Sequence, residues 1–412
     1  MQTLSPNLRS LLDRGVSLPL PHTVEVGPEV DPERIAGEGV VIHPGCRISG
    51  ARTLILPGAR IGEEGPATLI DCCLGREVRL KAGFFQGGVF LDGSEMGSGA
   101  HVRPGTLLEE KASSAHCVGL KHTILLPYVT LGSLINFCDV LIAGGTGKKD
   151  HSEVGSSYIH FNFSPNGDKA TPSLLGDVPR GVMLREAAIF LGGQGGLVGP
   201  ARIGFGTVIA AGTIWRGDFP SGGKLLLGKG SRGGKADFNP VAYRGIPRKV
   251  ANNLHYLANL LALRRWYLDI RLEVFGTETL ERRLLEAAVE NLEAGLDERL
   301  ARLDDLAGRM PASIAALSET DGSARNNQSA FAAGWPAARD VLVRARQWRG
   351  DEAKLRELRA ETVRRRKDGE NPYLETISTL DPEYARLGTN WLAGIADEAV
   401  TAAARPLGEA FA

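Results

Sequence analysis

The stretch "LDGSEMGSGAHVRPG", from Leu91 to Gly105, contains the period that decides the fold. Large apolar residues recur at every sixth position, and glycine or other small and polar residues fill the intervals. A helix would repeat near 3.6 residues and a lone amphipathic strand at two, so a period of six fits neither element alone. It fits a solenoid of short strands and tight turns, in which one large residue per flat face points inward.

The same count continues on both sides of this stretch. Its apolar anchors are Ile42, Ile48 and Leu54; Phe84, Phe90, Met96, Val102 and Leu108; and Leu191, Leu197, Ile203 and Ile209. Coils of three such hexads would stack and pair through parallel backbone hydrogen bonds. The pattern predicts a parallel β-helix over 39–218, preceded by a lead-in segment over 1–38.

The period changes in the last part of the chain. A Gly- and Lys-rich segment, 219–247, is predicted as a linker or exit loop before a helical domain over 248–412. Val250, Leu254, Leu257 and Leu261 step by four, three and four, which places them on one helix face. A second helix is predicted over 278–309, with Pro311 ending it. This helical tail either recruits a protein partner or caps the open end of the solenoid.

The composition favours an ordinary globular protein. Of 412 residues, 48 are basic and 48 acidic, so no net charge directs the chain to nucleic acid or to a membrane surface. No stretch approaches the roughly 18 apolar residues that span a bilayer. Five cysteines in a chain of this length fit a reduced compartment better than a disulfide framework. We therefore expect a cytoplasmic protein with no nucleic-acid or membrane partner.

Two cations stand eighteen positions apart in the regular part of the chain. Arg103 and Lys121 would therefore stack on the same face of adjacent coils. Like charges stacked in this way repel each other unless an anion lies between them, which predicts a phosphate or carboxylate ligand. The alternative is that both cations form surface salt bridges with Glu109 or Glu110.

Two stretches interrupt the period. In "HFNFSPNGDKATPSLLGD" (His160–Asp177), a Pro-Asn-Gly turn presents Lys169, and the Asn162 amide can both donate and accept hydrogen bonds. Asn162 either contacts a ligand or satisfies the backbone of the coil. The second stretch, "LIAGGTGKKDHSEVG" (Leu141–Gly155), must leave the solenoid at a corner. It carries Lys148, Lys149 and His151, and forms either a flap over an anionic ligand or a solvated turn.

The motifs "AHVRPG", "GLKH", "HFNFSPNGDK", "FLGGQGGLVGP" and "IGFGTVIAAGTI", in this order between about Ala100 and Asp218, resemble a known family. It is the acetyltransferase half of bacterial N-acetylglucosamine-1-phosphate uridyltransferase/glucosamine-1-phosphate acetyltransferase, a hexapeptide-repeat acyltransferase. The resemblance implies a left-handed β-helix, acetyl-CoA as acyl donor, an amino-sugar phosphate or sugar nucleotide as ligand, and sites between the subunits of a homotrimer. The sugar-phosphate contacts carried over are Arg103, Lys121, Lys169 and Asn136; the acetyl-CoA contacts are Asn162, Phe163, Gly193, Ala210 and Ala211.

The chain departs from this family at the catalytic position. Ser133 stands where the family has its catalytic histidine, and Asn136 where a tyrosine is usual. Either His151 supplies the missing base, with His122 and His160 as reserves, or acyl transfer has been lost. No "GxGTRM"-type motif occurs, so a nucleotidyltransferase activity is not expected.

Two other functions compete with the acyltransferase. A carbonic-anhydrase-like zinc site could draw on His116, His122, His151 and His160. No pair of these is eighteen apart, so such a site would need ligands from neighbouring subunits. The other is a non-catalytic trimeric scaffold or sugar-nucleotide-binding protein, which the missing histidine and the long helical tail favour.

Overall fold

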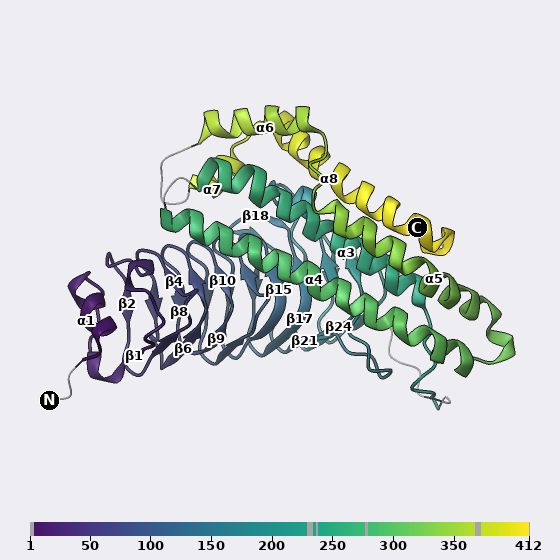
Figure 1. The fold of residues 1–412 in the computed structure, drawn as a ribbon, viewed down its shortest axis with the longest axis horizontal. Coiled ribbons are helices and arrows are strands. Elements are labelled where there is room, and N and C mark those ends of the chain that lie inside the picture. Colours follow the sequence, from purple (N-terminus) through teal and green to yellow (C-terminus); the bar gives the residue numbers. More distant parts are fainter. Residues whose placement is uncertain (1–3, 229–233, 236–237, 277–278, 367–371, 412) are drawn as a thin grey trace.

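The computed structural model describes residues 4–228, 234–235, 238–276, 279–366 and 372–411. Segments 229–233 and 236–237 of the predicted exit loop lie outside the described residues. Figure 1 shows a long stack of flat coils with a layer of helices lying along one flank. The predicted fold class, a left-handed parallel β-helix followed by a helical region, is confirmed.

The coils form a prism with three faces. Face 1 consists of β1 (Glu25–Val26), β3 (Arg47–Ser49), β6 (Ala67–Ile70), β9 (Gly83–Gln86), β12 (Ala100–Val102), β21 (Tyr158–Phe161), β24 (Gly195–Val198) and β27 (Ile214–Arg216). Face 2 consists of β4 (Leu54–Ile55), β7 (Cys73–Leu74), β10 (Val89–Phe90), β13 (Leu107–Leu108), β22 (Ser173–Leu175) and β25 (Arg202–Ile203). The long strands β15 (Gly119–Leu125) and β17 (Ile135–Ile142) bend round the corner between these faces and belong to both.

Face 3 is a separate ten-stranded parallel sheet. Its strands are β2 (Val41–Ile42), β5 (Arg60–Ile61), β8 (Arg79–Leu80), β11 (Glu95–Met96), β14 (Ser113–Ser114), β16 (Thr130–Leu131), β20 (Glu153–Val154), β23 (Phe190–Leu191), β26 (Val208–Ile209) and β28 (Leu225–Leu226). Strand pairing therefore runs from β1 to β28 and extends beyond both ends of the predicted range 39–218.

The coils differ in length. His101 pairs with Gly119, eighteen positions later, but Gly119 pairs with Asn136, seventeen positions later. Asn136 pairs with Ile159 and Ile159 with Gly196, so the next two coils carry insertions. The insertions leave at corners because the paired strands have no room for additional residues. One of them contains the hairpin of β18 (Gly145–Gly147) and β19 (Asp150–His151).

Most hexad anchors line the interior, but Leu54 and Phe84 do not. Leu54 lies in the outward column of face 2, in register with Cys73 and Val89, and Ile55 takes the inward position. Phe85 is fully buried, whereas Phe84 is only partly buried and stacks on His101, with ring centroids 5.1 Å apart. The chain turns at Gly83, which has φ +139°, and the coil between Leu80 and Met96 is only sixteen residues long. This shortening shifts the inward position by one residue.

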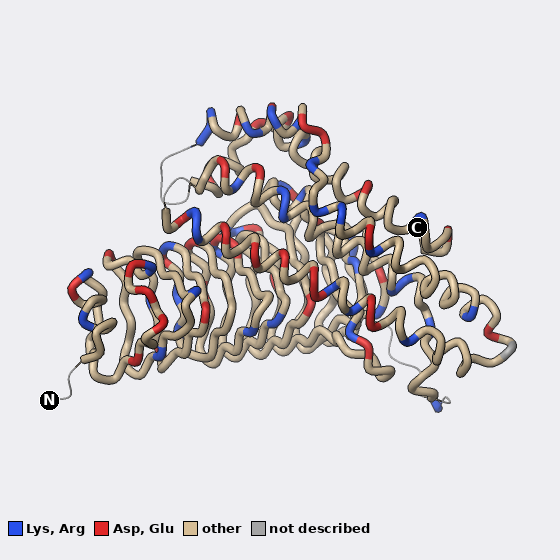
Figure 2. Tube along the Cα trace, viewed as in Figure 1, with Lys and Arg blue, Asp and Glu red and all other residues tan. Residues whose placement is uncertain are grey.

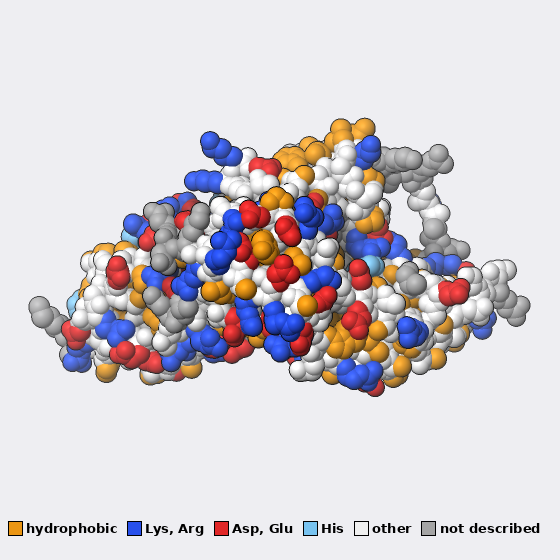
Figure 3. All heavy atoms as spheres, turned by 90° about the horizontal axis from the view of Figure 1, so that it is seen from above, with side chains coloured by type: hydrophobic (Ala, Val, Ile, Leu, Met, Phe, Trp, Pro, Cys, Tyr) orange, Lys and Arg blue, Asp and Glu red, His pale blue; other side chains and the backbone are white. Residues whose placement is uncertain are grey.

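The helices lie lengthwise beside the solenoid rather than over its end (Figure 1). They are α3 (Ile246–Trp266), η3 (Tyr267–Phe275), α4 (Thr279–Ala316), α5 (Gly322–Ala345), α6 (Glu352–Arg365), α7 (Pro372–Ser378) and α8 (Pro382–Ala404); the short α1 (Pro6–Asp13) precedes the coils. The prediction that Pro311 ends the second helix is wrong: α4 continues to Ala316, and Met310 and Ser313 on either side of the proline are buried. Figure 3 shows basic and acidic side chains interleaved over the outer surface of these helices. Within the described ranges, none of them is both long and apolar enough to cross a bilayer.

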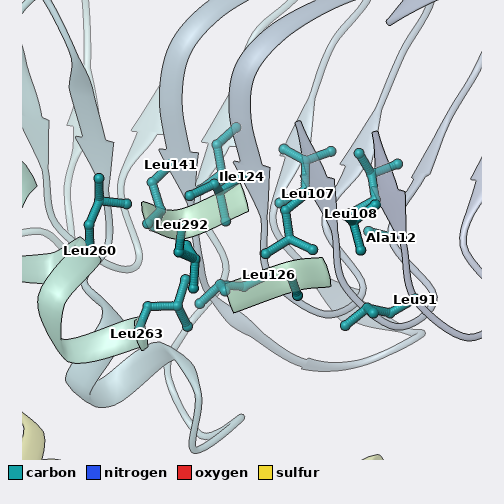
Figure 4. Packing of buried hydrophobic residues seen from close by; sticks show 14 of the residues in the cluster. Leu91, Leu107, Leu108, Ala112, Ile124, Leu126, Leu141, Leu260, Leu263 and Leu292 are labelled. Carbon is teal, nitrogen blue, oxygen red and sulfur yellow. The ribbon is translucent and has the colours of Figure 1, made fainter. Parts of the chain in front are cut away.

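Face 2 carries the helices because its outward positions are apolar in successive coils. Helix α4 contacts β7 and β10, and α3 contacts β22. Figure 4 shows this contact, with Leu107, Ile124 and Leu141 on the solenoid side and Leu260, Leu263 and Leu292 on the helix side. Each of these side chains is buried, and burying one leucine stabilises the fold by about 1.5–3 kcal/mol. Beside the helices that the structure describes, outward side chains of faces 1 and 3 such as Ile159 and Phe190 remain exposed.

Buried ion pairs also join the two regions. Arg271 from η3 pairs with Glu110 and lies 3.7 Å from Glu109, and the Tyr267 hydroxyl donates to Glu109 at 2.6 Å. Burial raises the pKa of Glu109 to about 7, against the opposing charge of Arg271. Figure 2 shows charges of both signs along α4, where it crosses the coils.

Candidate ligand site

Arg103 and Lys121 share one outward column at the corner where face 1 meets face 2, here called the 1/2 corner. The Arg103 N–H donates to the Leu120 carbonyl, and Lys121 pairs with Cys138 in the next coil. The Arg103 guanidinium reaches across Lys121 to the Cys138 Sγ, 3.4 Å away. Burial raises the pKa of the Cys138 thiol, and both cations oppose that shift. The structure thus brings the two predicted phosphate contacts together.

The salt-bridge alternative for these cations is wrong. Glu109 and Glu110 lie at the opposite edge of face 2, the corner with face 3, where they bind η3. Within the described residues, neither Arg103 nor Lys121 forms an ion pair. An anion bound between these two cations would relieve their mutual repulsion, so the anion site stays a prediction that their arrangement allows.

The helical region closes the other side of the 1/2 corner. Arg299 of α4 binds Asp139 at 2.8 Å, and the two side chains are only 3% and 5% exposed. His122 lies beside them, 3.9 Å from Glu298, and burial lowers its pKa. The space left between Gly105, His122 and Arg299 is about 10 Å³, room for one water at most. This space is therefore too small for a ligand, whereas Arg103 is exposed toward face 1.

The interrupted stretch that opens at His160 docks onto α3, α4 and the segment before α3, and this explains the break in the period. The Asn166 amide donates to the carbonyls of Pro240 and Ala242, at 2.9 and 3.2 Å, and Asp168 pairs with Lys249 at 2.8 Å. Arg299 also donates to the Lys169 carbonyl at 3.3 Å, while the Lys169 side chain remains exposed. The loop 162–172 is therefore held in place by contacts that its local sequence does not specify.

Asn162 uses its amide donor inside the corner. Its Nδ2 donates to Asp139 Oδ2 at 3.1 Å, so Arg299, Asp139 and Asn162 form one chain of polar contacts. Phe163, which follows it, is 60% exposed. The alternative that Asn162 satisfies the backbone of the coil is wrong for its amide nitrogen, which binds the Asp139 side chain instead. No protein partner for its amide oxygen is found among the described residues.

His151 lies away from the cations. It belongs to the β18–β19 hairpin at the corner between faces 2 and 3, where its Nδ1 is 2.9 Å from the Lys148 carbonyl. Lys148 and Lys149 are exposed on the same hairpin. This hairpin and the 1/2 corner lie at opposite edges of face 2, which the helices cover, so within one chain a ligand cannot lie between His151 and the two cations.

His160, a reserve candidate for the base, is a structural residue. Its Nδ1 is 2.6 Å from the Cys138 carbonyl and its Nε2 is 2.8 Å from the Ser173 hydroxyl. The carbonyl can only accept, so Nδ1 carries the proton and Nε2 accepts from Ser173. Burial lowers the pKa of His160 to about 4. Both nitrogens are occupied, and neither faces solvent.

The third corner, where face 3 returns to face 1, is here called the 3/1 corner. Gly193, Ala210 and Ala211 lie along it, and Ala211 is exposed. A side chain at position 193 would meet the Ser156 carbonyl at 2.7 Å, so the glycine allows adjacent coils to approach closely. The acetyl-CoA contacts implied by the resemblance therefore fall on two corners, with Asn162 and Phe163 at the other.

Ser133, the residue in the position of the family's histidine, also lies at the 3/1 corner. Its hydroxyl is 2.9 Å from Nδ1 of His116, which stands one coil earlier on the same corner. Asn136 follows three residues later, exposed on face 1 between this corner and the column of cations. Sequence reasoning missed the pairing of His116 with Ser133 because the two are seventeen positions apart rather than eighteen.

The four histidines considered for zinc do not meet within one chain. His116, His122 and His151 lie at three different corners, and His160 is enclosed in the coil. Among the described residues, no three His, Cys, Asp or Glu side chains are grouped so as to hold a metal ion.

The comparisons with known proteins point to one group of relatives. Bifunctional protein GlmU of Pelobacter propionicus is 30% identical over 220 residues, covering 52% of this chain and 41% of that protein. Bifunctional protein GlmU of Thermotoga sp. is 27% identical over 217 residues, covering 52% and 42%. The chain thus spans less than half the length of these relatives. No protein-family model matches it.

Similarity to solved structures is weak. A solved structure of the polysialic acid O-acetyltransferase OatWY matches 52% of this chain and 82% of its own chain at 15% identity, with a TM-score of 0.15. A TM-score this low supports no inference. The resemblance to hexapeptide-repeat acyltransferases therefore depends on the GlmU relatives and on the solenoid itself.

Proposed function

We propose, from the similarity of this solenoid to the hexapeptide-repeat acyltransferases of the GlmU type, that the chain is a CoA-dependent acyltransferase acting on an amino-sugar phosphate or sugar nucleotide. The observation that carries the proposal is the column of Arg103 and Lys121, two adjacent cations without carboxylate partners among the described residues, on a face that the helices leave open. A phosphate between them would receive charge-assisted hydrogen bonds, the stronger kind.

In this proposal, face 1 holds the acceptor. Arg103 and Lys121 bind the phosphate, with Lys169 approaching from the docked loop, and Asn136 offers an amide to sugar hydroxyls. The acyl donor lies along the 3/1 corner, where Gly193, Ala210 and Ala211 leave room for it. The acceptor's amine or hydroxyl attacks the thioester carbonyl, and CoA leaves as the thiol.

We also propose that the site is completed between subunits of a homotrimer. The implied acetyl-CoA contacts lie at two corners a full face apart, and a second subunit packed beside the 3/1 corner would bring contacts from both corners to one ligand. Apolar side chains are exposed on both faces beside the 3/1 corner: Ile159, Ile214, Phe190, Val208 and Leu225, each between 38% and 59% exposed. Since helices cover face 2, neighbouring copies would pack through faces 1 and 3. Val208→Glu should dissociate the assembly, as measured by light scattering.

The test is release of CoA thiol from acetyl-CoA with a panel of amino-sugar phosphates. Wild type should turn over at least one acceptor, and Arg103→Ala should raise KM for that acceptor much more than it lowers kcat. Arg47→Ala, on face 1 but several coils away, serves as the matched control and should behave as wild type. No thiol release with any acceptor would overturn the proposal.

The second candidate is a sugar-nucleotide-binding protein without catalysis. The replacement of the family's histidine by Ser133 favours it. Tight binding of a sugar nucleotide by wild type without any thiol release would support this candidate over the acyltransferase.

A further inference from the structure

A histidine and a serine are paired on the 3/1 corner, and the family resemblance implies a catalytic histidine at the serine's position, 133. Ser133 Oγ lies 2.9 Å from His116 Nδ1. Adjacent coils are about 4.8 Å apart. The His116 imidazole therefore lies one strand spacing from position 133, where the resemblance implies an imidazole. His116 is exposed, and its Nε2 has no protein partner among the described residues.

The backbone around Ser133 is fixed. Its N–H donates to Ser156 Oγ at 3.1 Å, and its carbonyl accepts from the Ser157 N–H at 2.8 Å. The next residue, Leu134, donates its N–H to the His116 carbonyl at 3.0 Å. These bonds tie three successive coils together, so the serine hydroxyl is held in place to orient the ring.

The geometry points to His116 as the general base of acyl transfer, with Ser133 as the residue that positions its ring; this rests on the proposed acyltransferase function. With Nδ1–H donating to the Ser133 hydroxyl, the Nε2 lone pair faces outward and is free to accept a proton. As the acceptor's amine or hydroxyl forms its bond to the acetyl carbonyl, Nε2 takes the proton. The C–S bond breaks, and the proton passes to the departing CoA thiolate, leaving neutral His116.

The location of the pair fits this role. Ser133 and Cys138 are five residues apart along face 1, about 16 Å at 3.3 Å per residue, so an acceptor whose phosphate lies between the cations would extend along face 1 toward Ser133. Asn136 lies exposed between them. The small residues Gly193 and Ala211 lie further along the same corner as His116. A donor on the corner and an acceptor on face 1 would therefore meet beside Nε2.

The experiment compares thiol release and acetyl-CoA binding in wild type, His116→Ala, Ser133→Ala and the double variant His116→Ala/Ser133→His. Loss of a general base lowers kcat by about 10²–10⁴-fold, and His116→Ala should fall in this range with unchanged acetyl-CoA affinity. Ser133→Ala should lower kcat less, because the ring remains. The double variant returns an imidazole to the family's position and should recover at least tenfold over His116→Ala. His22→Ala, another exposed histidine near the N-terminal end, should match wild type.

The outcomes separate this inference from the proposed function. If wild type turns over and His116→Ala keeps a similar kcat, His116 is not the base while the acyltransferase stands. Mass-spectrometric detection of acetylated Ser133 as an intermediate would also overturn it, since the serine would then be the nucleophile. If wild type releases no thiol with any acceptor, the proposed function fails and this inference with it. Matching circular dichroism spectra confirm that each variant is folded.

Discussion

Replacing Arg299 by methionine tests whether the helical region builds the ligand site or only covers a face. The substitution leaves the Asp139 carboxylate buried without its partner; the two side chains are 3% and 5% exposed. Removing one partner of a buried pair costs about 3–5 kcal/mol, because the remaining charge stays desolvated. Arg302→Met is the matched control: its pair with Glu298 lies on the same helix with side chains 27% and 23% exposed, and should cost at most about 1 kcal/mol.

The assay is urea unfolding, followed both by circular dichroism and by tryptophan fluorescence so that coincident transitions can be checked. A second comparison removes the charge of Asp139 as well. The double variant Asp139→Asn/Arg299→Met should have a higher free energy of unfolding than Arg299→Met, since it leaves no unpaired buried charge. Equal costs for Arg299→Met and Arg302→Met would refute the reasoning. So would a double variant no more stable than Arg299→Met.

Three further predictions follow from single features. Arg103→Ala and Lys121→Ala should each weaken glucosamine 1-phosphate binding about tenfold or more in calorimetry, since each removes a charge-assisted contact worth about 1.5–3 kcal/mol; unchanged affinity in both contradicts the anion site. Burial lowers the pKa of His160 from 6.5 to about 4, so the free energy of unfolding gains its full contribution from neutral His160 above about pH 6.5 and loses up to about 3 kcal/mol as the pH falls toward 4. His160→Gln should flatten this dependence of the free energy of unfolding on pH, and equal pH dependences in variant and wild type would contradict the prediction. Gly105→Ala should lower the melting temperature more than Gly212→Ala: both have positive φ, +82° and +72°, but only the first places Cβ against another residue, 2.0 Å from an imidazole nitrogen, and equal losses would exclude the clash.

Much of the solenoid could be predicted because its period is a local property of the sequence. Each coil requires one inward apolar residue per face, so the anchors can be recognised in the sequence without knowledge of distant contacts. That the outer side of face 2 is covered can also be predicted from the sequence. Its strands carry two adjacent apolar residues, as in Cys73-Leu74, Val89-Phe90 and Leu107-Leu108, which indicates a sheet covered on both sides. In the early coils of face 3 the outward strand positions are polar, as at Arg60 and Arg79.

Register errors begin where a coil is not eighteen residues long. A constant coil would place His116 next to residue 134, whose side chain is an exposed leucine. The actual coil is one residue shorter, as the pairing of Ser114 with Leu131 shows, and it brings His116 beside the Ser133 hydroxyl. A spacing rule applied without allowing for such variation misses this contact.

The part of the site that no local pattern could predict comes from α4. Arg299 is 160 positions from Asp139, yet its guanidinium binds that carboxylate, which in turn accepts from Asn162, and it also donates to the Lys169 carbonyl. The loop that presents Asn162 and Lys169 is thus specified by a helix distant in sequence. Removing the helices would expose the apolar outward column of face 2 and leave Asp139 and Glu110 without their arginines. The solenoid and the helices are therefore expected to unfold as one unit, and any function of face 1 depends on both.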